Sequence, residues 1–205
     1  MPLLKTLAFL VIILTVHGNE ASSAQNIKDG DIIFQTSKSS QSMAIQRATN
    51  SPYSHVGIIF YRDGKAYVFE AIKTVQYTAL KQWIARGDGK HFVIKRLREA
   101  DTVLTKAAVE ALRKEARRYT GKPYDLTFEW SDDRIYCSEL VWKIYEQGLG
   151  IKIGKLQRLK EFNLDDPIVQ RKMKERYGAD IPFDEPAVSP GEMFNASNLQ
   201  TVMKQ

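Results

Sequence analysis

The stretch 54–71, SHVGIIFYRDGKAYVFEA, decides the fold class predicted for this chain. Two runs rich in β-branched and aromatic residues flank Asp63 and Gly64. An Asp-Gly pair between two such runs is typical of a β-hairpin with a two-residue turn. The stretch therefore predicts two adjacent antiparallel strands.

The register of this hairpin brings two polar side chains together. A two-residue turn pairs Phe60 with Tyr67 and Gly57 with Glu70, and side chains alternate between the faces of a sheet. His55 and Glu70 then become diagonal neighbours on one face, with Cβ atoms roughly 7–8 Å apart. A three-residue turn with a bulge would instead turn Glu70 away from His55. We favour the two-residue turn because it forms a continuous apolar face from Val56, Ile58, Phe60, Tyr67 and Phe69.

The rest of the chain alternates between helical and strand-like patterns that end at Gly, Asn or Pro. Strands are predicted at 27–34 and 90–97. Helices are predicted at 39–50, 78–87, 102–121, 135–150 and 165–178, and a closing helix within 189–200, capped by Ser189. The sum is an α+β domain over residues 25–205, an antiparallel sheet packed against helices, with a loop-rich C-terminal extension from about 151.

The N-terminus is typical of a secretory signal peptide. A short basic start precedes an apolar run over residues 7–16, and small residues follow it, with Ser22 and Ala24 in the positions preferred before a cleavage site. The run is about half of the roughly 20 residues that span a bilayer, although an uncleaved anchor stays open. We expect residues 1–24 to be removed and the protein to be exported, to the periplasm or outside the cell.

Composition limits the function classes. The net charge of +6 suits an anionic cell wall or membrane surface, or simply a solvated exterior. No basic stripe interleaved with aromatic residues indicates nucleic-acid binding. After the signal segment only His55, His91 and Cys137 remain among the nitrogen and sulfur metal ligands, without metal-ligand spacing. We expect no metal and no other cofactor, although a metal site of histidine and carboxylate ligands stays open, as does the oligomeric state.

Cys137 is the only cysteine, and it lies where the helix of residues 135–150 begins. A helix N-terminus favours negative charge, which favours the thiolate, and it offers free backbone N–H groups. Together with His55 as base and Glu70 as its orienting carboxylate, Cys137 completes the parts of a thiol acyl-transfer enzyme. A lone cysteine on an apolar helix face is more often a small buried hydrophobe, so the alternative stays open. His91 is a weaker rival base.

Several motifs in order resemble the YiiX-like group of permuted NlpC-type, papain-like cysteine peptidases. They are DGDIIF, SHVGIIF, VFEA, GKPYD and YCSELV, and the likeness runs from about residue 27 to residue 150. In NlpC-type enzymes the cysteine helix precedes the histidine strand. In this chain the order is reversed, as in the permuted group, so the resemblance implies a circularly permuted papain-like fold.

The resemblance also implies roles for single residues. It makes Cys137 the nucleophile, His55 the base and Glu70 its partner, and it places Tyr124 by the substrate or the oxyanion, although a merely half-buried tyrosine is as plausible. It implies that Asp31 is structural and bonds backbone near the site. Residues 151–205 match no motif of the group.

The expected activity is hydrolysis of an amide through an acyl-enzyme, in cell-wall peptides such as peptidoglycan stems. One alternative is a lipid amidase or acyltransferase, as in the related lecithin retinol acyltransferase-like group. Another is a catalytically inactive binding module.

Overall fold

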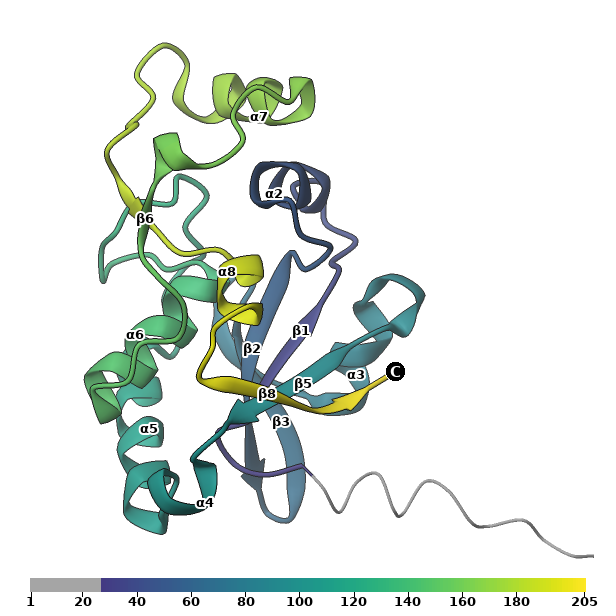
Figure 1. Cartoon of the computed structure of the whole chain (residues 1–205), viewed down its shortest axis with the longest axis vertical. Coiled ribbons are helices and arrows are strands. Elements are labelled where there is room, and N and C mark those ends of the chain that lie inside the picture. Colours follow the sequence, from purple (N-terminus) through teal and green to yellow (C-terminus); the bar gives the residue numbers. More distant parts are fainter. Residues whose placement is uncertain (1–26) are drawn as a thin grey trace, which may run out of the picture.

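A six-stranded antiparallel sheet lies at the centre of the molecule (Figure 1). The computed structural model describes residues 27–205, so the predicted signal segment lies outside the described residues. The strand order is β4-β3-β2-β1-β5-β8. The strands are β1 (Ile32–Gln35), β2 (His55–Arg62), β3 (Lys65–Ala71), β4 (Val75–Ala79), β5 (Val93–Leu97) and β8 (Leu199–Lys204), and a separate pair joins β6 (Gln157–Arg158) to β7 (Pro186–Ala187).

The hairpin of β2 and β3 has the predicted two-residue turn. Arg62 pairs with Lys65 across it, and both turn residues have positive φ, 49° at Asp63 and 72° at Gly64. Two successive positive φ angles match the twist of the strands they join. The register is therefore confirmed. Gly57 is required in it, because a Cβ atom there would lie 2.4 Å from Val68 Cγ1.

Helices cover both faces of this sheet. The described helices are α2 (Ser42–Thr49), α3 (Leu80–Arg86), α4 (Ala100–Val103), α5 (Lys106–Tyr119), α6 (Cys137–Leu149), α7 (Pro167–Tyr177) and α8 (Pro190–Phe194), with short 3₁₀ turns at η1 (Asp88–Lys90) and η2 (Leu159–Glu161). Helices α5 and α6 pack together, and α6 lies on β2 and β3. Helix α3 contacts β3 and β4.

Alternating side chains of the strands fill two apolar cores. Ile32, Ile58 and Phe69 point toward the core shared with α5 and α6. Ile33 and Ile59 point the other way and pack with Trp83 of α3. The predicted apolar face of the hairpin is confirmed for four of its five residues, Val56, Ile58, Phe60 and Phe69. Tyr67 is partly exposed and lies under the Arg62 guanidinium, 5.8 Å from its ring centre.

Three element predictions were wrong in part. The helix predicted at 102–121 is two helices, because Leu104 ends α4 and Thr105 caps α5, its hydroxyl accepting the Ala108 N–H at 3.2 Å. The helix predicted at 78–87 begins only at Leu80, after strand β4. The segment predicted to be a loop-rich extension ends in strand β8, which pairs with β5 at the edge of the main sheet.

The C-terminal segment reaches two distant parts of the fold. Helix α7 packs on α2, where Val169 and Met173 are buried beside Ala48 (Figure 1). Helix α8 begins as predicted, with Pro190 in its first turn and the Ser189 hydroxyl accepting the Glu192 N–H at 3.0 Å. Segment 151–205 is thus built into the same body as the sheet.

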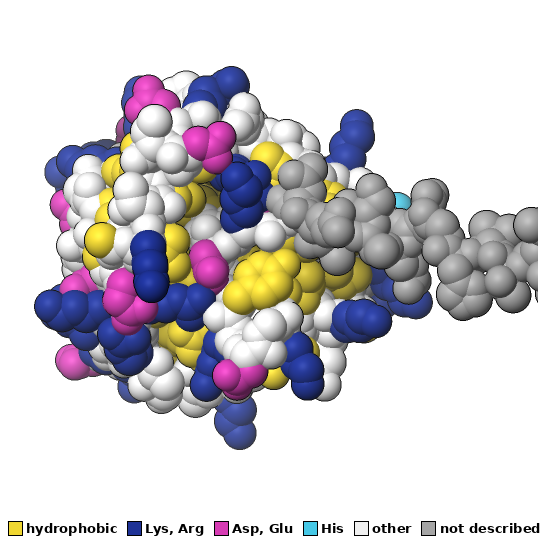
Figure 2. Space-filling view, turned by 90° about the horizontal axis from the view of Figure 1, so that it is seen from below, with side chains coloured by type: hydrophobic (Ala, Val, Ile, Leu, Met, Phe, Trp, Pro, Cys, Tyr) yellow, Lys and Arg dark blue, Asp and Glu magenta, His cyan; other side chains and the backbone are white. Residues whose placement is uncertain are grey.

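The exterior carries mixed charges. On the face shown in Figure 2, Lys and Arg side chains are scattered among acidic and hydrophobic ones. Among residues 27–205, no helix is both long and apolar enough to cross a membrane.

Candidate active site

Cys137 is the first residue of α6, as predicted. The preceding residue, Tyr136, has extended backbone (φ −98°, ψ 168°), so the chain turns into the helix at the cysteine. The thiol is unpaired and its residue is only 3% exposed. The first N–H groups of a helix have no partner within the helix, which leaves donors beside this sulfur.

His55 and Glu70 meet as the hairpin register predicts. His55 Nε2 lies 2.6 Å from Glu70 Oε2, and Glu70 has no exposed surface. The indole of Trp83 stacks on the imidazole, with ring centres 5.8 Å apart and planes 24° apart. The ring of His55 is therefore fixed both along its edge and across its face.

Arg86 adds a second cation to Glu70. Its Nη2 atom lies 2.7 Å from both carboxylate oxygens, and its side chain is 40% exposed. Burial raises the pKa of Glu70, but the hydrogen bond and charge of His55, a hydrogen bond from Thr78 and the charge of Arg86 outweigh burial and lower the pKa. Glu70 is thus an ionised carboxylate at neutral pH.

The other nitrogen of His55 is left for Cys137. The two side chains are hydrogen-bonded, and because Nε2 contacts Glu70, Nδ1 is the nitrogen available to the sulfur. Burial lowers the pKa of His55, but the hydrogen bonds to Cys137 and Glu70 outweigh burial and raise the pKa to about 9. At neutral pH His55 therefore holds its proton, as an imidazolium beside the Cys137 sulfur.

Tyr124 contacts the sulfur from another side. Its hydroxyl is hydrogen-bonded to Cys137 and accepts an N–H of Gln41 at 2.8 Å. Removal from water raises the pKa of Tyr124 well above its usual value, and the charge of Cys137 adds to this. The hydroxyl therefore keeps its proton and can donate it. Tyr124 thus lies beside Cys137 and is half-buried, and its contact with a substrate or an oxyanion stays a prediction.

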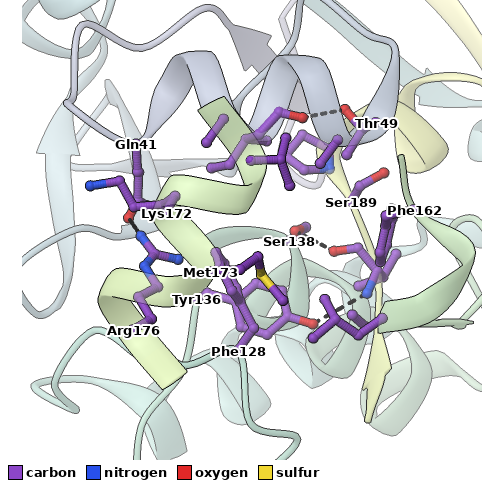
Figure 3. A pocket seen from close by; sticks show the side chains of 18 of the residues that line it. Gln41, Thr49, Phe128, Tyr136, Ser138, Phe162, Lys172, Met173, Arg176 and Ser189 are labelled. Carbon is purple, nitrogen blue, oxygen red and sulfur yellow. Dashed lines mark hydrogen bonds between the residues drawn. The ribbon is translucent and has the colours of Figure 1, made fainter. Parts of the chain in front are cut away.

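Two cavities meet at these residues. One is lined mostly by apolar side chains, many of them from α2, α7 and the β7–α8 segment (Figure 3). Cys137 is among its lining residues. The other is polar, and it is lined by His55, Arg86, Lys38 and several serines. Gln41 and Tyr124 line both cavities. An amide at Cys137 can therefore extend into an apolar space on one side and a polar space on the other.

Two other residues singled out in the sequence lie elsewhere. His91 is exposed, and its Nδ1 lies 3.3 Å from the carbonyl oxygen of Gln205. Asp31 is buried and accepts hydrogen bonds from the Lys28 N–H and the Arg96 guanidinium, at the opposite end of β1 from Gln35. Asp31 is structural, as implied, but its expected position near the site was wrong.

Comparison with known proteins places the chain in a family. Residues 26–203 match the family described as permuted papain-like amidase enzyme, YaeF/YiiX, C92 family. The chain belongs to this family. It is 49% identical over 195 residues to the uncharacterized protein YiiX of Escherichia coli strain K12, with 95% of each chain covered. The fold is therefore the permuted papain-like one.

A solved structure of a relative has the same fold. The crystal structure of yiiX from Escherichia coli O157:H7 has a TM-score of 0.84 at 52% identity, and the match covers 88% of this chain and 98% of that one. That protein is described as a metalloprotein. Within residues 27–205 of this chain, no three His, Cys, Asp or Glu side chains gather as metal ligands, so the site described above does not fit a bound metal.

The sequence did not reveal three residues of the site. Arg86, Trp83 and Gln41 belong to helices or helix ends whose local patterns give no sign of a functional contact. The one available signal was Glu70 itself, since a charge in an apolar strand needs partners. The position of Glu70 predicted that this carboxylate has a partner, and His55 is that partner. Nothing in the sequence indicated the second partner, Arg86.

Proposed function

We propose that this chain is a cysteine amidase in which Cys137 is the nucleophile, His55 the base and Glu70 the group that orients His55. The observation that carries the proposal is the continuous contact from Glu70 through His55 to Cys137, with 2.6 Å between the carboxylate and the ring. Family membership as a permuted papain-like amidase supports the same reaction class.

The reaction follows from these contacts. His55 takes the thiol proton, the sulfur attacks the amide carbonyl, and a tetrahedral oxyanion forms. When the C–N bond breaks, His55 gives its proton to the departing amine, which leaves a thioester on Cys137. His55 then takes a proton from water, the hydroxide attacks the thioester, and the thiolate leaves as the acid forms. No cofactor enters these steps.

Donors for the oxyanion lie beside the sulfur. The backbone N–H of Cys137, at the helix start, and the Tyr124 hydroxyl are the two we propose. A donor aimed at developing charge stabilises the transition state more than the substrate. In the proposed role Tyr124 contacts the reacting atoms and is a catalytic residue.

Substrate placement follows from the two cavities. Cys137 becomes bonded to the acyl part and His55 protonates the amine, so the apolar cavity at Cys137 would hold the acyl part and the polar cavity at His55 the amine. Cell-wall peptides remain a proposed substrate because the predicted export signal would bring the protein to them. The apolar lining favours a second candidate, an amide with a fatty acyl group.

The location of the activity is also proposed. The predicted signal peptide and the net charge of +6 are consistent with a protein that acts in the periplasm or outside the cell, at an anionic wall or membrane surface.

The first test compares Cys137→Ala and His55→Ala with His91→Ala. Purified proteins are incubated with muropeptides and with N-acyl lipids, and products are identified by mass spectrometry. We expect the first two variants to form no product and His91→Ala, a substitution at an exposed histidine, to match the wild type. Product formed by Cys137→Ala would end the proposal.

The same experiment separates the substrates. Product from muropeptides alone supports a cell-wall amidase, and product from N-acyl lipids alone supports the lipid alternative. If neither forms, alkylation of Cys137 by iodoacetamide tests the binding-module alternative. An enzyme-like thiol reacts much faster at pH 7 in the wild type than in His55→Ala, whereas a binding module shows equal rates.

A further inference from the structure

Arg176 of α7 is a half-buried cation in the wall of the apolar cavity (Figure 3). Among the described residues it forms no ion pair with a carboxylate. Its Nη2 donates to Gln41 Oε1 at 2.5 Å, and its guanidinium lies 4.9 Å from the ring centre of Phe128. Removing a cation from water costs free energy unless hydrogen bonds or an opposite charge compensate it. Gln41 is the hydrogen-bond acceptor that compensates Arg176.

The hydrogen bond between Arg176 and Gln41 fixes the direction of the hydrogen bond between Gln41 and Tyr124. A guanidinium can only donate, so the amide oxygen of Gln41 must face Arg176 and the amide nitrogen must face Tyr124. The Tyr124 oxygen accordingly accepts, at 2.8 Å from Gln41 Nε2. The Tyr124 proton is then left for its other neighbour, Cys137, or for an oxyanion formed there.

We propose that Arg176 and Gln41 are positioning residues that hold the Tyr124 hydroxyl as a donor toward Cys137 and the oxyanion. The inference rests on the proposed amidase function and assigns a role to the C-terminal segment, which carries Arg176 and has no catalytic motif of its own. Without Arg176 the Gln41 amide could turn over, and Tyr124 could donate to its oxygen instead of toward the sulfur.

The decisive variant is Gln41→Glu, which keeps the size of the side chain but changes its hydrogen bonding and adds a negative charge. A carboxylate accepts from both neighbours, so it keeps the contact with Arg176 and adds an opposite charge to it, but it makes Tyr124 donate away from Cys137. We expect a folded protein with an unchanged or higher thermal midpoint. With decanoyl p-nitroanilide as substrate, kcat should fall about 100-fold or more, as for the loss of one oxyanion donor, with little change in KM.

Arg176 itself is tested with two substitutions and a control. Arg176→Lys keeps a cation whose hydrogen bonds can only be donated, and it should retain most of kcat. Arg176→Met should lower kcat by about as much as Gln41→Glu does. Arg171→Met, at an exposed position on the same helix, is the matched control and should equal the wild type. Equal losses for Lys and Met at position 176 would overturn the proposal.

The background variant Tyr124→Phe separates this role from a structural one. If Arg176 and Gln41 act through Tyr124, their substitutions should cost less than about twofold in that background. A loss that persists there would show that Arg176 binds substrate directly or only supports the fold, and either result overturns the proposal.

A readout without substrate keeps the two proposals distinct. The rate at which iodoacetamide alkylates Cys137 at pH 7 should fall several-fold in Gln41→Glu and in Tyr124→Phe, and no further in the double variant. An inactive Cys137→Ala with an unaffected Gln41→Glu would sink only the positioning role. An active Cys137→Ala would sink the amidase function, while the alkylation rates still decide whether Gln41 orients Tyr124.

Discussion

At the scale of the residue, Glu70 is a buried charge with two cations. A buried carboxylate is tolerated only when it is paired and hydrogen-bonded. His55 alone would compensate Glu70 only while its ring carries a proton, and in the proposed reaction the ring gives that proton to the leaving amine. Because Arg86 keeps its charge throughout, Glu70 stays compensated when His55 is neutral. We infer that Arg86 allows His55 to lose and regain its proton without leaving the Glu70 carboxylate as an unpaired buried charge.

The first prediction concerns pH. Activity should fall as pH rises through about 9, since above this pKa His55 has no proton for the leaving amine. Burial lowers the pKa of His55 while the hydrogen bonds to Cys137 and Glu70 raise it, so Glu70→Gln, which removes the charge, should lower the pKa. The alkaline limb of kcat/KM against pH should move to lower pH, and the maximum should fall by about tenfold or more. An alkaline limb that does not move would contradict the role of Glu70.

The same raised pKa has a consequence for stability. Its value of about 9 exceeds the ordinary 6.5, so the native state holds this proton more tightly than the unfolded chain. The stabilisation is complete below pH 6.5 and is lost as pH rises through about 9.

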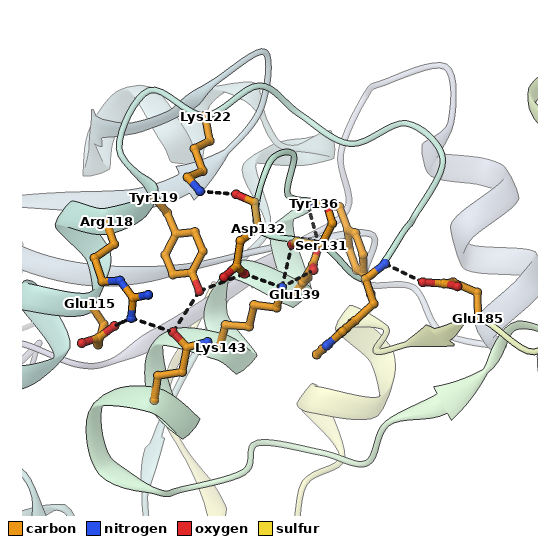
Figure 4. A network of polar contacts seen from close by, with 12 residues as sticks. Glu115, Arg118, Tyr119, Lys122, Ser131, Asp132, Tyr136, Glu139, Lys143 and Glu185 are labelled. Carbon is orange, nitrogen blue, oxygen red and sulfur yellow. Dashed lines mark hydrogen bonds and ion pairs between the residues drawn. The ribbon is translucent and has the colours of Figure 1, made fainter.

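At the scale of the element, α6 carries the proposed nucleophile as its first residue. A polar network also lies along this helix (Figure 4). Lys143 Nζ lies 2.9 Å from Glu139 Oε1, 2.8 Å from Asp132 Oδ1 and 2.6 Å from the Ser131 carbonyl oxygen. Glu139 Oε2 in turn accepts the Tyr136 N–H at 3.4 Å. The network joins the loop before Cys137 to the helix after it, and so holds the backbone at Cys137 from both sides.

The second prediction concerns this helix. Burial raises the pKa of Glu139 to about 8 although Lys143 opposes the rise. An acid whose pKa is raised on folding binds its proton more tightly in the native state, so its effect is to make the free energy of unfolding fall as pH rises from about 4.5 to about 8. Glu139→Gln should remove this contribution and leave that of His55, while the Gln side chain still accepts the Tyr136 N–H. Urea unfolding of the wild type and the variant at pH 5 and pH 8.5 measures the change in the free energy of unfolding between the two pH values.

Glu110→Gln is the control for this measurement. Glu110 is an exposed glutamate on α5, and its substitution should leave the pH dependence of the wild type in place. A pH dependence in Glu139→Gln as steep as that of the wild type would show that Glu139 does not carry it.

At the scale of the whole molecule, sequence reasoning succeeded where contacts are local and failed where they are not. The register of the hairpin and the start of α6 follow from neighbouring residues, and they place His55, Glu70 and Cys137. Gln41 and Arg176 are 135 residues apart, and no local pattern links them. Strand β8 is likewise a short run without strict alternation of apolar and polar residues, and it pairs with β5, a segment about a hundred residues earlier.

The last prediction tests whether the C-terminal segment is part of the central fold. Leu199 of β8 is 2% exposed and packs in the core shared by the sheet with α5 and α6, opposite Leu97 of β5. Leu199→Ala should lower the free energy of unfolding by about 2–4 kcal/mol, because it leaves a cavity in a packed core. Gln200→Ala, at the next, exposed position of the same strand, should change it by less than about 0.5 kcal/mol. Urea unfolding measures the free energy of unfolding of both variants. Equal values for Leu199→Ala and Gln200→Ala would mean that β8 lies against the edge of the sheet without contributing to its core.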